Sequence, residues 1–65
     1  MRPELNYLVF AMEYYRAKKG LSGREVARLF SEHGVYGLIE RNYFLYHIES
    51  PDLMVAEVDK AMARP

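Results

Sequence analysis

The chain has 65 residues, a length that fits one domain and buries only about 60% of the surface of the unfolded chain. Hydrophobic residues make up 51% of it and cysteine is absent, which excludes disulfides and thiolate metal sites as supports for the core. Nine basic residues balance nine acidic ones, and this neutrality argues against a dedicated DNA-binding domain, which is usually basic.

The first predicted helix spans residues 3–19. Pro3 suits the first helical position, where no amide hydrogen is needed, and Gly20 is the residue type that ends helices in a left-handed conformation. Apolar residues between Leu5 and Ala17 surround this helix almost completely and leave only a narrow polar strip. Such a helix has to be buried on more than one side. Because the chain is short, we expect another molecule to bury part of its apolar surface.

A capping-box pattern opens the second predicted helix, residues 22–33. Ser22 is the cap, and Glu25 three residues later completes the box. The third predicted helix follows Gly34 and spans residues 35–47. It resembles the first helix because apolar residues lie on several of its sides.

The fourth predicted helix spans residues 51–63, with Ser50 as its cap and Pro51 at its first position. Its apolar residues share one side, as in an ordinary amphipathic helix. No segment alternates between apolar and polar residues as a strand does. The sequence therefore predicts an all-α fold, a single helical domain over residues 1–65 built as a compact bundle of four short helices.

The two broadly apolar helices, the first and the third, are expected at the centre of this bundle. Four short helices cannot enclose both of them completely, so some aromatic side chains are expected at the surface. The candidates are Tyr7, Phe10 and Tyr14 in the first helix and Tyr36, Tyr43 or Tyr46 in the third. An aromatic stripe at helical spacing is more often core than interface, whereas tyrosine is enriched in binding surfaces. Both interpretations stay open at this point.

Residues that carry catalytic chemistry form no recognisable group in this sequence. His33 and His47 lack a metal-ligand spacing, and no serine has the surroundings of a nucleophile. Glu57 and Asp59 lie on different sides of one predicted helix. We therefore expect no enzyme, no cofactor, no metal and no small-molecule substrate. No apolar run approaches the roughly 20 residues that span a bilayer, so we expect a cytoplasmic protein without a membrane partner.

Five basic residues gather within 13 positions: Arg16, Lys18, Lys19, Arg24 and Arg28. One interpretation is a solvated helix end, where basic residues complement the helix dipole. The other is a patch for an acidic partner or a phosphate. Residues 21–43 also read as a helix-turn-helix, but their second helix offers little besides Arg41 to contact base edges. DNA binding is therefore the second choice.

The sequence also resembles a known family through a set of short segments. They are Lys19-Gly20-Leu21-Ser22-Gly23-Arg24-Glu25-Val26, Leu29-Phe30, Gly34-Val35, Leu45, His47 and Val58-Asp59. The family consists of short bacterial and phage-associated proteins of unknown function, often encoded beside an ADP-ribosyltransferase-like toxin. That neighbourhood implies an antitoxin-type or accessory binding role. The family typically has Leu-His-Thr before its last helix, where this chain has Tyr46-His47-Ile48.

These observations predict a small protein-interaction module, an antitoxin-like or regulatory partner of another bacterial protein. Its expected binding residues are four aromatic side chains that enter a groove of the partner and two arginines that steer the encounter: Tyr7, Phe10, Tyr14, Tyr43, Arg24 and Arg28. A homo-oligomer would bury the same surface. The alternatives are a helix-turn-helix-like DNA-binding regulator and a phage-encoded inhibitor of a host enzyme.

Overall fold

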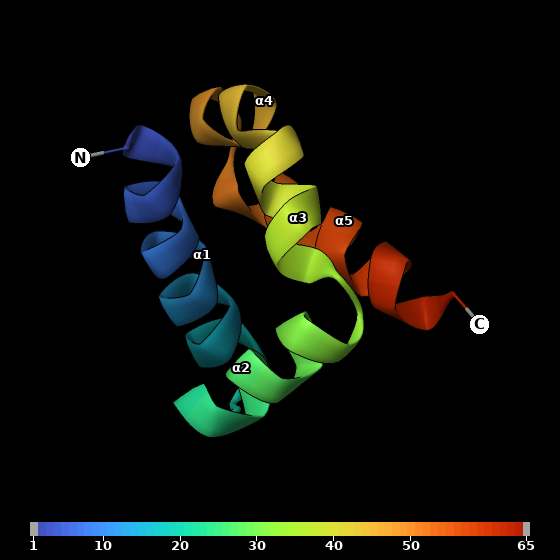
Figure 1. Ribbon diagram of the computed structural model, residues 1–65. Helices are drawn as coiled ribbons and strands as arrows, with labels where there is room; N and C mark the ends of the chain where they lie inside the picture. Colours follow the sequence, from blue (N-terminus) through green and yellow to red (C-terminus); the bar gives the residue numbers. More distant parts are fainter. Residues whose placement is uncertain (1, 65) are drawn as a thin grey trace.

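The structure, a computed structural model, describes residues 2–64 as five helices (Figure 1). They are α1 (Pro3–Lys19), α2 (Gly23–Glu32), α3 (Val35–Arg41), α4 (Tyr43–Ile48) and α5 (Pro51–Ala63). No strand occurs within these residues. The expected all-α fold is confirmed.

The helix ends that the sequence predicts are present. Gly20 ends α1 in the left-handed conformation, with a φ of 68°. At the start of α2, the Ser22 hydroxyl accepts a hydrogen bond from the Glu25 amide at 3.1 Å, and the Glu25 carboxylate accepts one from the Ser22 amide at 2.8 Å. The Ser50 hydroxyl caps α5 by accepting from the Asp52 amide at 3.2 Å. Each of these signals is local, which is why the sequence alone predicts them.

The third predicted helix, residues 35–47, is interrupted at Asn42, so the prediction of one continuous helix there is wrong. Asn42 has a φ of −110° and a ψ of 17°, outside the helical range. Its side-chain amide donates a hydrogen bond to the carbonyl of Leu38 at 2.9 Å. Asparagine side chains compete in this way for backbone partners and thereby interrupt helices. The short helix α4 follows the break.

Helices α1 and α3 lie at the centre, as expected, because each of them contacts all four other helices. Helix α2 contacts only these two, and it does not contact α4 or α5. Figure 1 accordingly shows α2 at one end of the molecule and α4 at the other. The molecule thus has two ends formed by different helices.

The core draws on all five helices. Its buried members are Ala11, Tyr15, Val26, Phe30, Val35, Ile39, Tyr46, Met54, Val55 and Val58. Tyr46 was expected among the candidates for the surface, and that expectation is wrong because its side chain is only 1% exposed. Tyr36 is half-buried against this core. Only Ala11 and Tyr15 of α1 are fully part of it, so much of this apolar helix lies outside the core.

Candidate functional site

Six large apolar side chains remain exposed, three on α1 and three on α4. They are Leu5, Val9, Phe10, Phe44, Leu45 and Ile48. Phe10 contacts Tyr7, the ring of α1 that meets α4, and we call Phe10, Phe44, Leu45 and Ile48 the α1/α4 face. Leu5 and Val9 lie two residues on either side of Tyr7 and are therefore on the side of α1 away from α4. The exposed fractions of the six side chains range from 44% for Phe10 to 72% for Phe44. Because α1 and α4 are in contact, the two groups lie on neighbouring helices. The expectation that this chain cannot cover all of its apolar surface is confirmed.

A row of six rings in contact runs along this face from one helix to the other. In order, they belong to Tyr14, Phe10, Tyr7, Tyr43, His47 and Phe44, with neighbouring ring centroids 4.5 to 5.8 Å apart. The contact between Tyr7 and Tyr43 joins α1 to α4 edge-to-face. The structure therefore brings together the four aromatic residues predicted as partner-binding. Rings held by such contacts lose little freedom when a partner covers them.

The four predicted rings differ in how much they offer to a partner. Tyr7 is half-buried, and its hydroxyl donates to the carbonyl of Tyr46 at 3.4 Å. Burial, with a smaller contribution from the neighbouring Tyr46, raises the pKa of Tyr7 above its usual value. Tyr43 is also half-buried and stacks on His47. Phe10 is the one of the four that belongs to the α1/α4 face.

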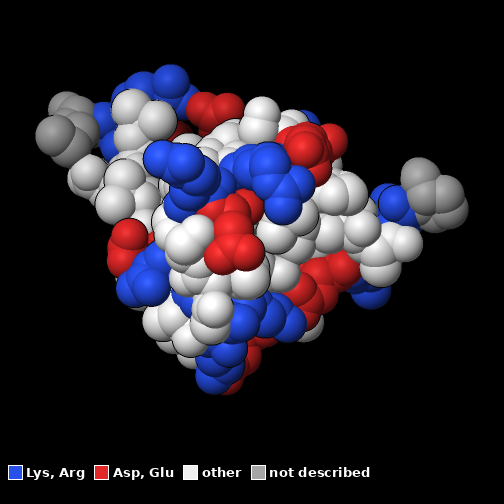
Figure 2. Space-filling model, turned by 90° about the horizontal axis from the view of Figure 1, so that it is seen from below, with Lys and Arg blue, Asp and Glu red and all other residues white. Residues whose placement is uncertain are grey.

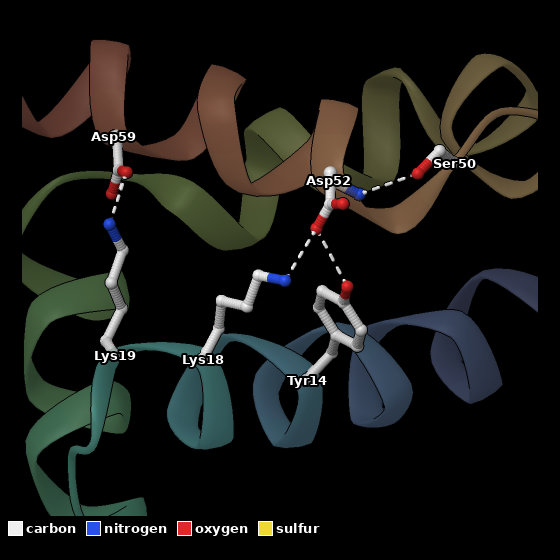
Figure 3. Close-up of polar contacts among 6 residues, drawn as sticks. All are labelled: Tyr14, Lys18, Lys19, Ser50, Asp52 and Asp59. Carbon is white, nitrogen blue, oxygen red and sulfur yellow. Dashed lines mark hydrogen bonds and ion pairs between the residues drawn. The ribbon is translucent and has the colours of Figure 1, made fainter.

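Tyr14 takes part in the contact between α1 and α5, which Figure 3 shows. Its hydroxyl donates to the carboxylate of Asp52 at 2.8 Å, and the Lys18 ammonium lies 3.2 Å from the same oxygen. About two turns further along α5, Asp59 pairs with Lys19 at 2.6 Å and accepts a hydrogen bond from the Tyr15 hydroxyl. These contacts hold the C-terminal half of α1 against α5.

Both carboxylates of this contact are acidified by their partners. The Tyr14 hydroxyl, followed by the Lys18 ammonium, holds the pKa of Asp52 below its usual value. Burial pushes the pKa of Asp59 upward, but the hydrogen bonds from Lys19 and Tyr15 outweigh it and the net pKa is lowered. Lys18 and Lys19 therefore serve the fold, beyond the helix-dipole role that the sequence indicates.

The two predicted steering arginines lie on α2, at the end of the molecule away from α4. Arg28 pairs with Glu32 at 3.3 Å, while Arg24 forms no ion pair within residues 2–64. Figure 2, which shows this end, has basic and acidic side chains interleaved. The structure thus does not bring the two arginines together with the ring row, and their neighbourhood is not a continuous basic patch.

The would-be recognition helix of a helix-turn-helix is α3. It has seven residues, and all four other helices contact it. Its Val35 and Ile39 are fully buried. A recognition helix has to present its side chains to a DNA groove. The central position of α3 argues against its use as a recognition helix.

Three of the four residues of the α1/α4 face, Phe44, Leu45 and Ile48, are not among the predicted binding residues. A signal was present in the spacing, because Phe44 and Ile48 are four residues apart and lie on a different side of the helix from Tyr43 and Tyr46. Within the part of the chain that the structure describes, there is no cavity, no group of three or more residues able to hold a metal ion, and no helix suited to crossing a membrane.

Comparison with known proteins places the chain in a family. A family model described as "Protein of unknown function (DUF3791)" matches residues 6–64, which is nearly the whole chain. The chain therefore belongs to this family. No curated protein and no solved structure matches it significantly.

Proposed function

We propose that this member of the DUF3791 family is a small protein-binding module that docks another bacterial protein through the α1/α4 face. The observation that carries the proposal is the exposure of Phe10 on α1 and of Phe44, Leu45 and Ile48 on α4, with a row of rings that joins the two helices. Scattered exposed leucines are normal, but large apolar side chains gathered on one short helix beside such a row are typical of an interaction site.

The energetics of this face suit moderate affinity. Full burial of a phenylalanine or isoleucine side chain contributes about 1.5–3 kcal/mol, and side chains that are already half covered contribute less. Association costs several kcal/mol in lost freedom of the two molecules, so only the surplus appears as affinity. Phe44 is the most exposed member, at 72%, and the ring of His47 supports it from the side. Phe44 is therefore the proposed anchor.

The resemblance of the sequence to short bacterial and phage-associated proteins indicates which partner to test first. Those proteins are often encoded beside an ADP-ribosyltransferase-like toxin, and an antitoxin-like or regulatory role follows if the chain covers part of such an enzyme. Arg24 and Arg28 keep a steering role in this proposal, because long-range attraction needs no contact with the docking face.

The test is a calorimetric titration of an ADP-ribosyltransferase-like protein of the kind encoded beside the similar bacterial proteins. We expect the wild type to bind and Phe44→Asp to bind at least tenfold more weakly, because a carboxylate would be buried without a partner. The matched control is Ala56→Asp, which adds the same charge at an exposed position of α5. Equal binding by wild type and Phe44→Asp, or no binding at all, would contradict the proposal.

A further inference from the structure

We propose that α4 opens as a unit in the free chain, over residues 43–49, while α1, α2, α3 and α5 stay packed against one another. A segment of a small domain opens separately when few contacts hold it. Four features of α4 point to such an opening: the side chains that it buries, its two junctions, its polar contacts with other helices, and the oxygen of its buried tyrosine. The inference concerns the chain alone and does not depend on the proposed function.

Helix α4 has little buried surface of its own. It is the shortest of the five helices, and Tyr46 is its one buried residue, whereas each of the other helices buries two or three. Tyr43 adds a half-buried ring that meets Tyr7 edge-to-face, and the other four of the six residues are exposed. A helix of this length is not stable by itself, so its position depends on these two rings.

Both junctions of α4 are fastened to the neighbouring helices and not to α4. At the first junction, the side-chain amide of Asn42 donates to the carbonyl of Leu38 in α3, so α4 begins without a side-chain cap. At the second junction, the hydroxyl of Ser50 accepts from the Asp52 amide and caps α5. Residues 43–49 are therefore able to move while Asn42 and Ser50 keep their places.

Polar contacts between α4 and the other helices are few. Within residues 2–64 one side-chain hydrogen bond joins them, from the Tyr7 hydroxyl to the carbonyl of Tyr46, and at 3.4 Å it is long for its type. No residue of α4 forms an ion pair in the same part of the chain. Helix α5, by contrast, is tied to α1 by the hydrogen bonds and ion pairs of Asp52 and Asp59. The pair of α1 and α5 thus stays together when α4 leaves.

The buried tyrosine of α4 favours the open state through its oxygen. The hydroxyl of Tyr46 is buried, and it has no hydrogen-bond partner among the described residues. Opening returns this hydroxyl to water, where it forms hydrogen bonds, and this gain offsets part of the cost of exposing the ring. In the described parts of the other helices, no buried side-chain nitrogen or oxygen is left without a partner.

Opening of α4 also dismantles the α1/α4 face. Phe44, Leu45 and Ile48 lie on α4 and Phe10 lies on α1, so the four side chains separate when the two helices part. The face is complete only in the closed state. The fraction of closed chains then sets the apparent affinity of any molecule that docks there.

Amide hydrogen exchange of the whole chain in increasing urea tests the opening. After correction for intrinsic rates, we expect the amides of Tyr46, His47 and Ile48 to exchange at least about tenfold faster than those of Phe30 and Val58. The three α4 amides should share one urea dependence, weaker than that of the two reference amides, because opening α4 exposes less surface than unfolding the chain. Equal rates and equal urea dependence in the two groups would overturn the proposal. So would α4 amides that differ from one another or do not respond to urea.

The variant Tyr15→Phe distinguishes an opening of α4 from unfolding of the whole chain. It removes a hydrogen bond to Asp59 that ties α1 to α5, so the reference amides in α2 and α5 should exchange several-fold faster. The α4 amides should keep the rates of the wild type, because this contact stays intact while α4 alone is open. Equal acceleration of both groups would show that α4 opens only when the whole chain unfolds, and it would overturn the proposal.

Discussion

Tyr46 has the largest fully buried side chain in the molecule, and its hydroxyl is the one buried side-chain polar atom without a hydrogen-bond partner within residues 2–64. Burial, followed by the nearby Glu57 charge, raises the pKa of this hydroxyl. A buried hydroxyl that finds no partner costs free energy relative to water. The ring of Tyr46 therefore stabilises the core, and its oxygen opposes that contribution.

We expect Tyr46→Phe to leave the free energy of unfolding unchanged or to raise it by up to about 1 kcal/mol, because the substitution removes an unsatisfied polar atom and keeps the ring. Tyr15→Phe is the matched control, since the Tyr15 hydroxyl donates to Asp59 at 2.5 Å. It should lower the free energy of unfolding by about 1 kcal/mol. Urea denaturation measures both. A loss of more than 1 kcal/mol for Tyr46→Phe would show that its hydroxyl has a partner in solution.

At the scale of elements, α1 and α5 are joined by the two carboxylates of Asp52 and Asp59. Both have a lowered pKa in the folded chain because of the tyrosine and lysine partners described above. In the unfolded chain each returns to the ordinary value near 3.9. The unfolded state therefore binds more protons in acid, and stability rises with pH across this window.

The contribution of this pair is expected to be fully present above about pH 4–5 and to be lost as the pH falls through the lower pKa values of the folded state. Because the side chain of Asp52 is 62% exposed and that of Asp59 is 40% exposed, the effect is reduced by solvent screening. The urea midpoint of the Asp52→Asn, Asp59→Asn double variant should fall less between pH 6 and pH 2.5 than that of the wild type. The control Glu49→Gln removes a carboxylate outside this pair. A double variant with the same acid sensitivity as the wild type would contradict the assignment.

Sequence reasoning succeeds for these elements where the signal is local. The caps at Ser22 and Ser50 and the left-handed Gly20 depend on a few neighbouring residues, and all three are found. The sequence does not predict the break at Asn42, because asparagine is tolerated within a helix. The hydrogen bond from its side chain to the Leu38 carbonyl exists only once the turn has formed.

The candidate site is harder to predict because its helices are apolar on several sides. The periodicity of apolar residues identifies the buried side of an amphipathic helix. It does not distinguish buried from exposed sides when apolar residues surround nearly the whole helix. Tyr46 and Phe44 are both large, aromatic and two residues apart, yet Tyr46 is 1% exposed and Phe44 is 72% exposed. Only the contacts of α4 with α1, α3 and α5 decide which of them is buried.

At the scale of the whole molecule, the end formed by α4 and the end formed by α2 have different characters. The α1/α4 face is apolar and aromatic, whereas the α2 end carries interleaved charges (Figure 2). A fold of this size cannot bury every apolar residue that its two central helices carry. The consequence is that large apolar side chains of α1 and α4 stay exposed, and we propose that those of the α1/α4 face are the binding surface.

Methyl nuclear magnetic resonance tests this claim most directly, because it locates a contact without altering the chain. The labelled chain would be titrated with an ADP-ribosyltransferase-like protein of the kind encoded beside the similar bacterial proteins. We expect the methyl signals of Leu45 and Ile48 to shift or broaden, and those of the exposed Ala17 and Ala56 to stay unchanged. Binding that moves the signals of α2 and leaves Leu45 and Ile48 unchanged would contradict this proposal.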